Sequence, residues 1–143
     1  MSLNYAWPIA LVVVSNVVYH ICSKTLSRDI DPMVSLFITY LTAGVLTAVI
    51  YFFTKSDRTM AQEFQHIGWP SIALGVVIVG LEFGYIMAYR AGWNISIGSL
   101  VANISLAVIL LAVGTLLYKE VVSLKQAAGA ALCIIGLILI QHK

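Results

Sequence analysis

The hydrophobic positions of this chain fall into five long apolar stretches that are separated by short polar segments. A helix needs about 20 apolar residues to cross ~30 Å of hydrocarbon, and each stretch is close to that length. The pattern therefore predicts one all-α membrane domain over residues 1–143. Its five transmembrane helices are expected at about 5–25, 32–53, 69–90, 96–118 and 122–141.

The boundaries of the stretches carry helix-end signals. Asp31-Pro32 offers an N-capping carboxylate followed by proline at the first helical position. Ser123 and Gln126 have the spacing of a capping box, and Gly92 is a C-cap candidate after the third stretch. These signals favour helices that begin and end at the boundaries of the stretches.

The polar loop 54–68 is the longest segment between the stretches. Met60, Phe64 and Ile67 recur in it at helical spacing, so we expect a short amphipathic turn on the membrane surface. The loop has no phosphate-binding glycines and no nucleophile–base pair. The chain also has no HExxH motif and no paired intramembrane aspartates, so we expect that it is not an enzyme.

Composition supports the membrane assignment. Hydrophobic residues make up 61% of the chain and charged residues 10%, which is too little polar surface for a soluble globule. The net charge of +2 is too small and too scattered to indicate nucleic acid as a partner. Cys22 and Cys133 lie in apolar stretches without partners at metal-binding spacing, so we expect packing residues, no metal and no cofactor.

Glu82 is the one acidic residue that cannot be placed at a membrane surface. A charge at that depth costs at least ~3 kcal/mol, so its side chain must face protein or water. Helical spacing puts Tyr85 and Tyr89 on the same face. Burial disfavours the charged form of a carboxyl group, so Glu82 is predicted to bind substrate or a proton. The alternative is a packing helix in which a neutral Glu82 is hydrogen-bonded to tyrosine or histidine.

Other polar side chains also recur at helical spacing and are candidates to line the same site. On the first stretch they are Asn16, Tyr19, His20 and Ser23. This face lines either a cavity or a hydrogen-bonded seam between helices, because lipid cannot satisfy it. Ser99 and Asn103 share a face of the fourth stretch. We name Asn16, His20, Ser99 and Asn103 as candidate substrate-binding or proton-binding residues.

Hydroxyl groups and glycines form further patterns. The second stretch carries Ser35, Thr39 and Thr42 on one face, and Tyr40, Gly44, Thr47 and Tyr51 on another. Hydroxyl groups on a membrane helix can bond to carbonyls of their own helix, so both sets are weak evidence for a site. The glycine pairs Gly80/Gly84 and Gly129/Gly136 predict close helix packing.

The Lys and Arg residues are balanced across the predicted membrane. One side collects Lys55, Arg58, Lys119 and Lys125, and the other collects Lys24, Arg28, Arg90 and Lys143. Lys/Arg asymmetry sets orientation, so a balanced chain is expected to insert in both directions. Two opposed copies form an antiparallel homodimer, the intermolecular counterpart of inverted repeats.

Short sequence segments carry a family resemblance. They are Met87-Ala88-Tyr89-Arg90-Ala91-Gly92, Ser99-Leu100-Val101-Ala102-Asn103-Ile104-Ser105, Leu116-Leu117-Tyr118-Lys119-Glu120, Gln126-Ala127-Ala128-Gly129 and Ile135-Gly136. In this order, the segment 75–140 resembles an EamA-type half of the drug/metabolite transporter superfamily, which is related to the small multidrug exporters. The resemblance implies an antiparallel homodimer of ten helices. Asn16 stands in the region where those exporters carry their essential carboxylate, so Glu82 is not a residue transferred from them.

The predicted function is secondary active transport in the cell membrane by alternating access. The substrate is a small organic metabolite or an amphipathic or cationic compound, with proton coupling through Glu82. No nucleotide-binding motif is present, so a gradient must drive transport. The alternatives are a non-transporting membrane partner or scaffold subunit, and half of a heterodimeric transporter.

Overall fold

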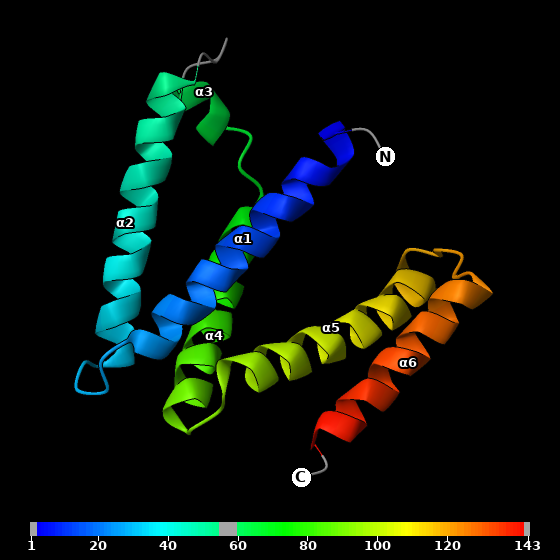
Figure 1. Cartoon of the computed structure of the whole chain (residues 1–143). Helices are drawn as coiled ribbons and strands as arrows, with labels where there is room; N and C mark the ends of the chain where they lie inside the picture. Colours follow the sequence, from blue (N-terminus) through cyan, green and yellow to red (C-terminus); the bar gives the residue numbers. More distant parts are fainter. Residues whose placement is uncertain (1–2, 55–59, 142–143) are drawn as a thin grey trace. The chain divides into compact units, whose positions relative to one another are not determined.

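The computed structural model describes residues 3–54 and 60–141, and the regular structure of this part is helical throughout (Figure 1). The helices are α1 Leu3–Thr25, α2 Pro32–Phe53, α3 Met60–Phe64, α4 Trp69–Arg90, α5 Ile95–Leu117 and α6 Leu124–Gln141. The all-α prediction is confirmed, and each long helix ends within two residues of its predicted bounds.

Four helices are long and apolar enough to cross a membrane. Their spanning segments are Ala6–Thr25, Pro32–Phe53, Trp69–Arg90 and Ile95–Leu117. The fifth, α6, has 18 residues and rises about 27 Å, a little less than the ~30 Å hydrocarbon core. Four of the five predicted spans are thus supported by length and composition, and the crossing by α6 stays a prediction.

The helix ends form as the sequence predicts. The Asp31 carboxylate accepts hydrogen bonds from the backbone N–H groups of Met33 at 2.8 Å and Val34 at 3.4 Å. Gly92 follows α4 with a φ of +104°, a conformation that L side chains disfavour. These ends are local features, because each is made by residues only a few positions apart.

The capping box of α6 also forms. The Gln126 side-chain oxygen accepts from the Ser123 N–H at 2.8 Å, and the Gln126 N–H donates to the Ser123 hydroxyl at 3.3 Å. Both partners of the motif are therefore engaged with each other.

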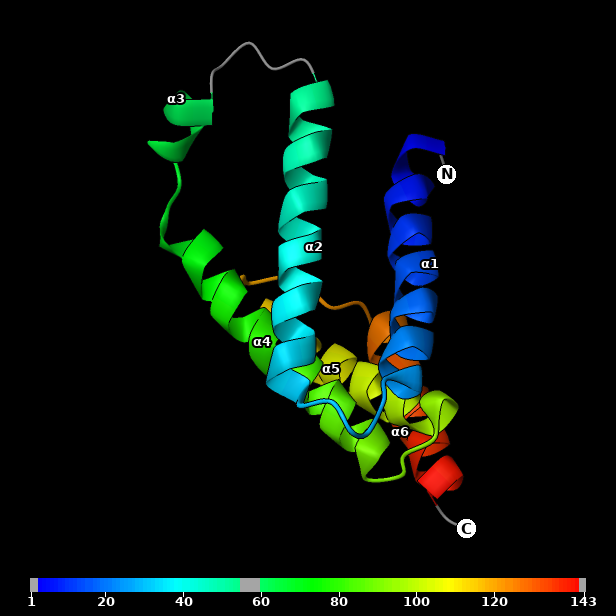
Figure 2. The ribbon, with the colours of Figure 1, turned by 90° about the vertical axis from the view of Figure 1, so that its left-hand side faces the viewer.

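A short helical turn exists at the predicted position as α3, a helix of five residues, and its place on the membrane surface stays a prediction. Figure 2 shows α3 set apart from both α2 and α4, and joined to α4 by a non-helical segment. The basic residues Lys55, Arg58 and Lys143, which enter the predicted charge balance, lie outside the described residues.

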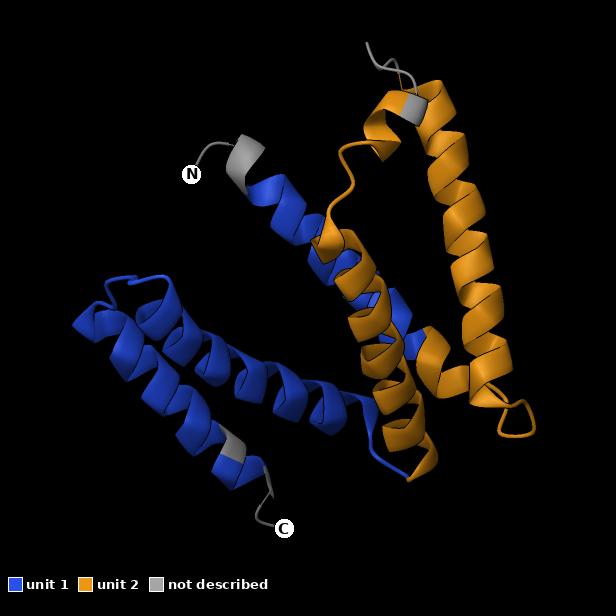
Figure 3. Ribbon diagram, turned by 180° about the vertical axis from the view of Figure 1, so that it is seen from behind, with its two compact units in different colours: residues 1–21, 92–143 blue, residues 22–91 orange. Residues whose placement is uncertain are grey.

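The chain divides into two compact units (Figure 3). Unit 2 comprises residues 22–91, which hold the end of α1, α2, α3 and α4. Its most buried side chains are Leu36 of α2 and Ile86 and Tyr89 of α4, each 3–4% exposed. The contact between α2 and α4 therefore forms the small core of this unit.

Unit 1 comprises residues 1–21 and 92–143, and its α5 and α6 lie side by side as an antiparallel hairpin (Figure 1). After α5 the chain turns at Lys119, whose φ is +53°. The Glu120 N–H then bonds back to the Gly114 carbonyl at 3.0 Å. A Cβ built on Gly114 would lie 2.5 Å from the Glu120 carboxylate, which is the end of a flexible, exposed side chain that would have to turn aside.

Most apolar side chains of the long helices are exposed, as expected where lipid is the solvent. Within unit 2, nothing lies within 4 Å of a Cβ built at Gly80 or Gly84. The same holds for Gly129 within unit 1. The close packing predicted for these glycines is therefore not made inside the unit that carries each one.

Candidate functional site

Glu82 lies beside the α2–α4 core of unit 2. It precedes Ile86 by one helical turn, and Tyr40 follows Leu36 by one turn on α2. Because the two helices are antiparallel, these offsets bring the Glu82 and Tyr40 side chains to the same level. Both residues are half-buried.

The Tyr40 hydroxyl lies close enough to the Glu82 carboxylate to feel its charge, but no hydrogen bond of standard geometry joins the two groups. Glu82 is the charged side chain that acts on the Tyr40 hydroxyl. The hydroxyl oxygen is buried and has no partner at standard hydrogen-bond geometry among the described residues. A hydrogen bond from the Tyr40 hydroxyl to the Glu82 carboxylate would satisfy this buried donor.

Two stacked phenol rings continue from Glu82 along the same face of α4. The Tyr85 and Tyr89 rings have centroids 6.1 Å apart and planes inclined by 28°. The Lys24 ammonium from the end of α1 lies 5.5 Å from the Tyr89 ring centroid, which is within cation–π range. The carboxylate and the phenols are thus arranged in line, and an ammonium group covers the ring farthest from Glu82.

Arg90 fastens the connection between α1 and α2 to the end of α4. Its Nη2 donates hydrogen bonds to the backbone carbonyls of Ser27 at 3.0 Å and Ile30 at 2.5 Å. A guanidinium suits this role because its donors are fixed in a fork. These two hydrogen bonds, called the Arg90 clamp below, hold the α1–α2 connection against the end of α4 nearest Tyr89.

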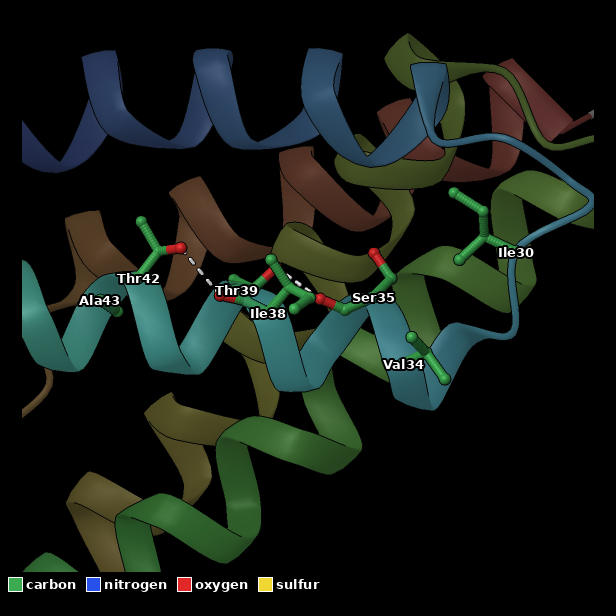
Figure 4. Close-up of a pocket in the computed structure, with 7 residues that line it drawn as sticks. All are labelled: Ile30, Val34, Ser35, Ile38, Thr39, Thr42 and Ala43. Carbon is green, nitrogen blue, oxygen red and sulfur yellow. Dashed lines mark hydrogen bonds between the residues drawn. The ribbon is translucent and has the colours of Figure 1, made fainter.

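An open groove of about 590 Å³ lies on a different face of α2 (Figure 4). The hydroxyls on this face are already engaged, since Thr39 donates to the Ser35 carbonyl at 3.0 Å and Thr42 to the Ile38 carbonyl at 2.8 Å. Figure 4 shows these groups turned back onto their own helix. These hydroxyls therefore have local structural partners, and their face stays weak evidence for a site.

The remaining predicted site residues belong to unit 1. Asn16 is exposed on α1, whereas His20 is 7% exposed. The Tyr19 and His20 rings meet edge to face at 5.2 Å. The Ser99 hydroxyl donates to the Ile95 carbonyl of its own helix at 2.6 Å. Ser99 therefore has a local structural partner.

Asn103 lines a groove of about 390 Å³ between α5 and α6. Its walls are mostly apolar, and Gln126 and Cys133 contribute from α6. Cys22 is exposed on α1, so the packing role predicted for it is not fulfilled within unit 2. Within the described ranges, no group of three or more His, Cys, Asp or Glu residues could hold a metal ion.

The sequence pattern did not single out Tyr40 or the Arg90 clamp as parts of the site. A signal for Tyr40 existed, because Tyr40, Thr47 and Tyr51 share one face of α2, and this is the face on which the Glu82 contact forms. The partners of Arg90 are backbone carbonyls, which leave no trace in residue types. Its position in the last turn of α4 indicated only a favourable charge at a helix end.

A comparison with protein families matches residues 5–141 to the EamA-like transporter family. The match covers nearly the whole chain and includes the segments on which the resemblance rests. Searches with the chain match no curated protein and no solved structure. The relation to the small multidrug exporters stays a prediction.

Proposed function

We propose, from the premise that this chain belongs to the EamA-like transporter family, that it is a secondary transporter in the cell membrane. It moves a small organic metabolite or an amphipathic or cationic compound by alternating access. The observation that carries the assignment of the site is Glu82, a carboxylate inside an apolar span that faces a phenol of the neighbouring helix.

Glu82 is the group that couples transport to protons. Among the described residues, Tyr40 is the group that interacts with its carboxylate, and no cationic side chain does so. An uncompensated negative charge within a span is costly, so a proton or a positively charged substrate group balances it. When these two compete for one carboxylate, movement of substrate in one direction drives protons in the other.

The working unit is an antiparallel homodimer in which α6 is a fifth span. Asn16 and Asn103 are exposed on apolar helices, and their amides cannot be satisfied by lipid. A second copy offers partners to these amides, and the balanced Lys and Arg residues favour its opposite insertion. A cysteine introduced at Gln62, in a variant without Cys22 and Cys133, is expected to label from both sides of the membrane. Labelling from one side only contradicts opposite insertion.

Proton-coupled flux in proteoliposomes tests the function. Vesicles that contain a pH-sensitive dye are exposed to a panel of organic amines, amino acids and neutral metabolites. At least one compound is expected to move protons with the wild-type protein, and Glu82→Gln is expected to reduce this flux to the level of empty vesicles.

Glu63→Gln is the matched control, because it makes the same chemical change in α3, outside the spans. It is expected to retain full flux. Coupled flux that persists in Glu82→Gln contradicts the coupling role. If the wild type moves no compound of these classes, a non-transporting membrane partner becomes the better assignment.

A further inference from the structure

Tyr40 is placed to control the state of Glu82. Neither the family resemblance nor the charge pattern gives Tyr40 a role, yet its hydroxyl is buried beside the Glu82 carboxylate. We propose that Tyr40 is a positioning residue that donates a hydrogen bond to the ionised carboxylate and releases it when a proton or a cationic substrate group binds. This inference rests on the proposed function of Glu82.

The geometry favours closure of the Tyr40–Glu82 hydrogen bond. Leu36 and Ile86 are the buried residues one turn away from the pair on α2 and α4, so the backbone is held close at this level. A buried hydroxyl without a good partner costs about 1–3 kcal/mol. A hydrogen bond to an ionised carboxylate is shorter and stronger than one between neutral groups. The hydroxyl therefore gains most from moving onto the carboxylate when Glu82 is charged.

No other titratable group in the described part of unit 2 takes this position. On α4, Tyr85 and Tyr89 stack on each other, and the Lys24 ammonium lies over the Tyr89 ring. Tyr51 is on the same face of α2 as Tyr40 but about three turns farther along. Tyr40 is the side chain that interacts with the Glu82 carboxylate.

Loss of the Tyr40–Glu82 hydrogen bond links the group bound at Glu82, a proton or a substrate cation, to the contact between α2 and α4. Protonation or cation binding weakens the carboxylate as an acceptor, and the phenol keeps its own proton throughout. The polar link between the helices is then lost, and the apolar contact between Leu36 and Ile86 remains. The occupant of Glu82 thereby changes the strength of the contact between α2 and α4, which is the kind of bias that alternating access requires.

The experiment follows the carboxyl band of Glu82 by infrared difference spectroscopy during a pH titration of the purified protein in lipid nanodiscs. The band is identified by its loss in Glu82→Gln. In Tyr40→Phe, the pH at the midpoint of the band is expected to rise by about one unit, because the ionised form loses a donor. Tyr51→Phe is the matched control and is expected to leave the midpoint unchanged.

A midpoint that is unchanged in Tyr40→Phe overturns the proposal. If Tyr40→Phe does not fold, the wild type labelled with ¹³C-tyrosine provides the test. A tyrosine band that shifts with the midpoint of the carboxyl band supports the proposal, and tyrosine bands that are silent across that titration overturn it.

The titration needs neither substrate nor transport, so its failure is distinct from that of the proposed function. A shifted midpoint in a protein that transports nothing supports the role of Tyr40 and rejects the transport assignment. Coupled flux that requires Glu82, combined with an unchanged midpoint in Tyr40→Phe, rejects the role of Tyr40 alone.

Discussion

The α2–α4 region of unit 2 and the α5–α6 hairpin of unit 1 differ in where their polar side chains make hydrogen bonds. In unit 2, hydroxyls such as Thr39 bond to their own helix, but two side chains also reach other segments. Tyr40 lies near Glu82 on another helix, and Arg90 bonds to the loop between α1 and α2. Such contacts change whenever the helices move, so this region is suited to couple chemistry to motion.

In the α5–α6 hairpin the polar side chains bond mainly to their own helix or its cap. The Thr115 hydroxyl donates to the Leu111 and Ala112 carbonyls at 3.1 and 2.9 Å. The capping box of Ser123 and Gln126 closes on itself in the same way. These bonds survive rigid movement of the hairpin, so the hairpin is suited to serve as a scaffold.

The largest stability difference is expected from the Arg90 clamp. Arg90→Ala removes a charged donor from two backbone carbonyls and is expected to lower the free energy of unfolding by about 2 kcal/mol. Arg90→Lys is expected to recover only part of this loss, because its flexible ammonium group is not held in the fixed planar geometry in which Nη2 reaches both carbonyls. Unfolding in mixed micelles with increasing SDS measures both variants.

Arg28→Ala is the control for the clamp, because Arg28 is exposed in the same connecting segment. It is expected to leave stability unchanged. Equal stability of Arg90→Ala and the wild type would show that the hydrogen bonds to Ser27 and Ile30 do not hold the segment.

The helix caps are expected to have equal effects in both regions. Asp31→Ala at α2 and Ser123→Ala at α6 are each expected to cost about 1 kcal/mol, because each removes a side-chain acceptor from the first turn. Asp31→Asn keeps an acceptor and is expected to retain most of the stability. The same SDS titration measures all three variants. If a cap variant in one region has the same stability as the wild type, contacts beyond the first turn stabilise the start of that helix.

The smallest effect concerns two glycines within the hairpin. In Gly114→Ala the new methyl group meets the Glu120 carboxylate, whereas in Gly129→Ala it enters open space within the unit. Alanine favours helix equally at both positions, and the exposed Glu120 side chain can turn aside at small cost, so Gly114→Ala is expected to be less stable than Gly129→Ala by about 0.5 kcal/mol.

Glu120→Ala in the Gly114→Ala background is expected to remove the difference. Equal stability of the two glycine variants would mean that the Glu120 side chain moves aside at no cost. The comparison of melting temperatures in the same detergent measures this difference.

The helices and their ends could be predicted from the sequence because they depend on neighbours along the chain. The carboxylate of Asp31 caps residues two and three positions away, and apolar length alone defines the spans. Glu82 could be singled out because the free-energy cost of a charged side chain inside a membrane can be stated without knowing which residue lies beside it. The stacking of Tyr85 and Tyr89 follows from the helical repeat.

The partners between segments could not be predicted because they depend on how the helices pair. The level at which Tyr40 meets Glu82 is set by the α2–α4 contact, and the periodicity of one helix contains no information about it. The role of Ser99 could not be predicted for a related reason. Its hydroxyl is satisfied by the Ile95 carbonyl, and spacing cannot distinguish such a bond from a binding role.

The most direct test of the account is proton release on substrate binding. Purified protein in weakly buffered detergent is titrated with a compound that the flux assay selects, and a pH indicator follows the solution. Binding is expected to release protons in the wild type and in Glu63→Gln, and no longer to do so in Glu82→Gln. Equal proton release in Glu82→Gln, or binding to the wild type without release at any pH, would contradict exchange of a proton for substrate at Glu82.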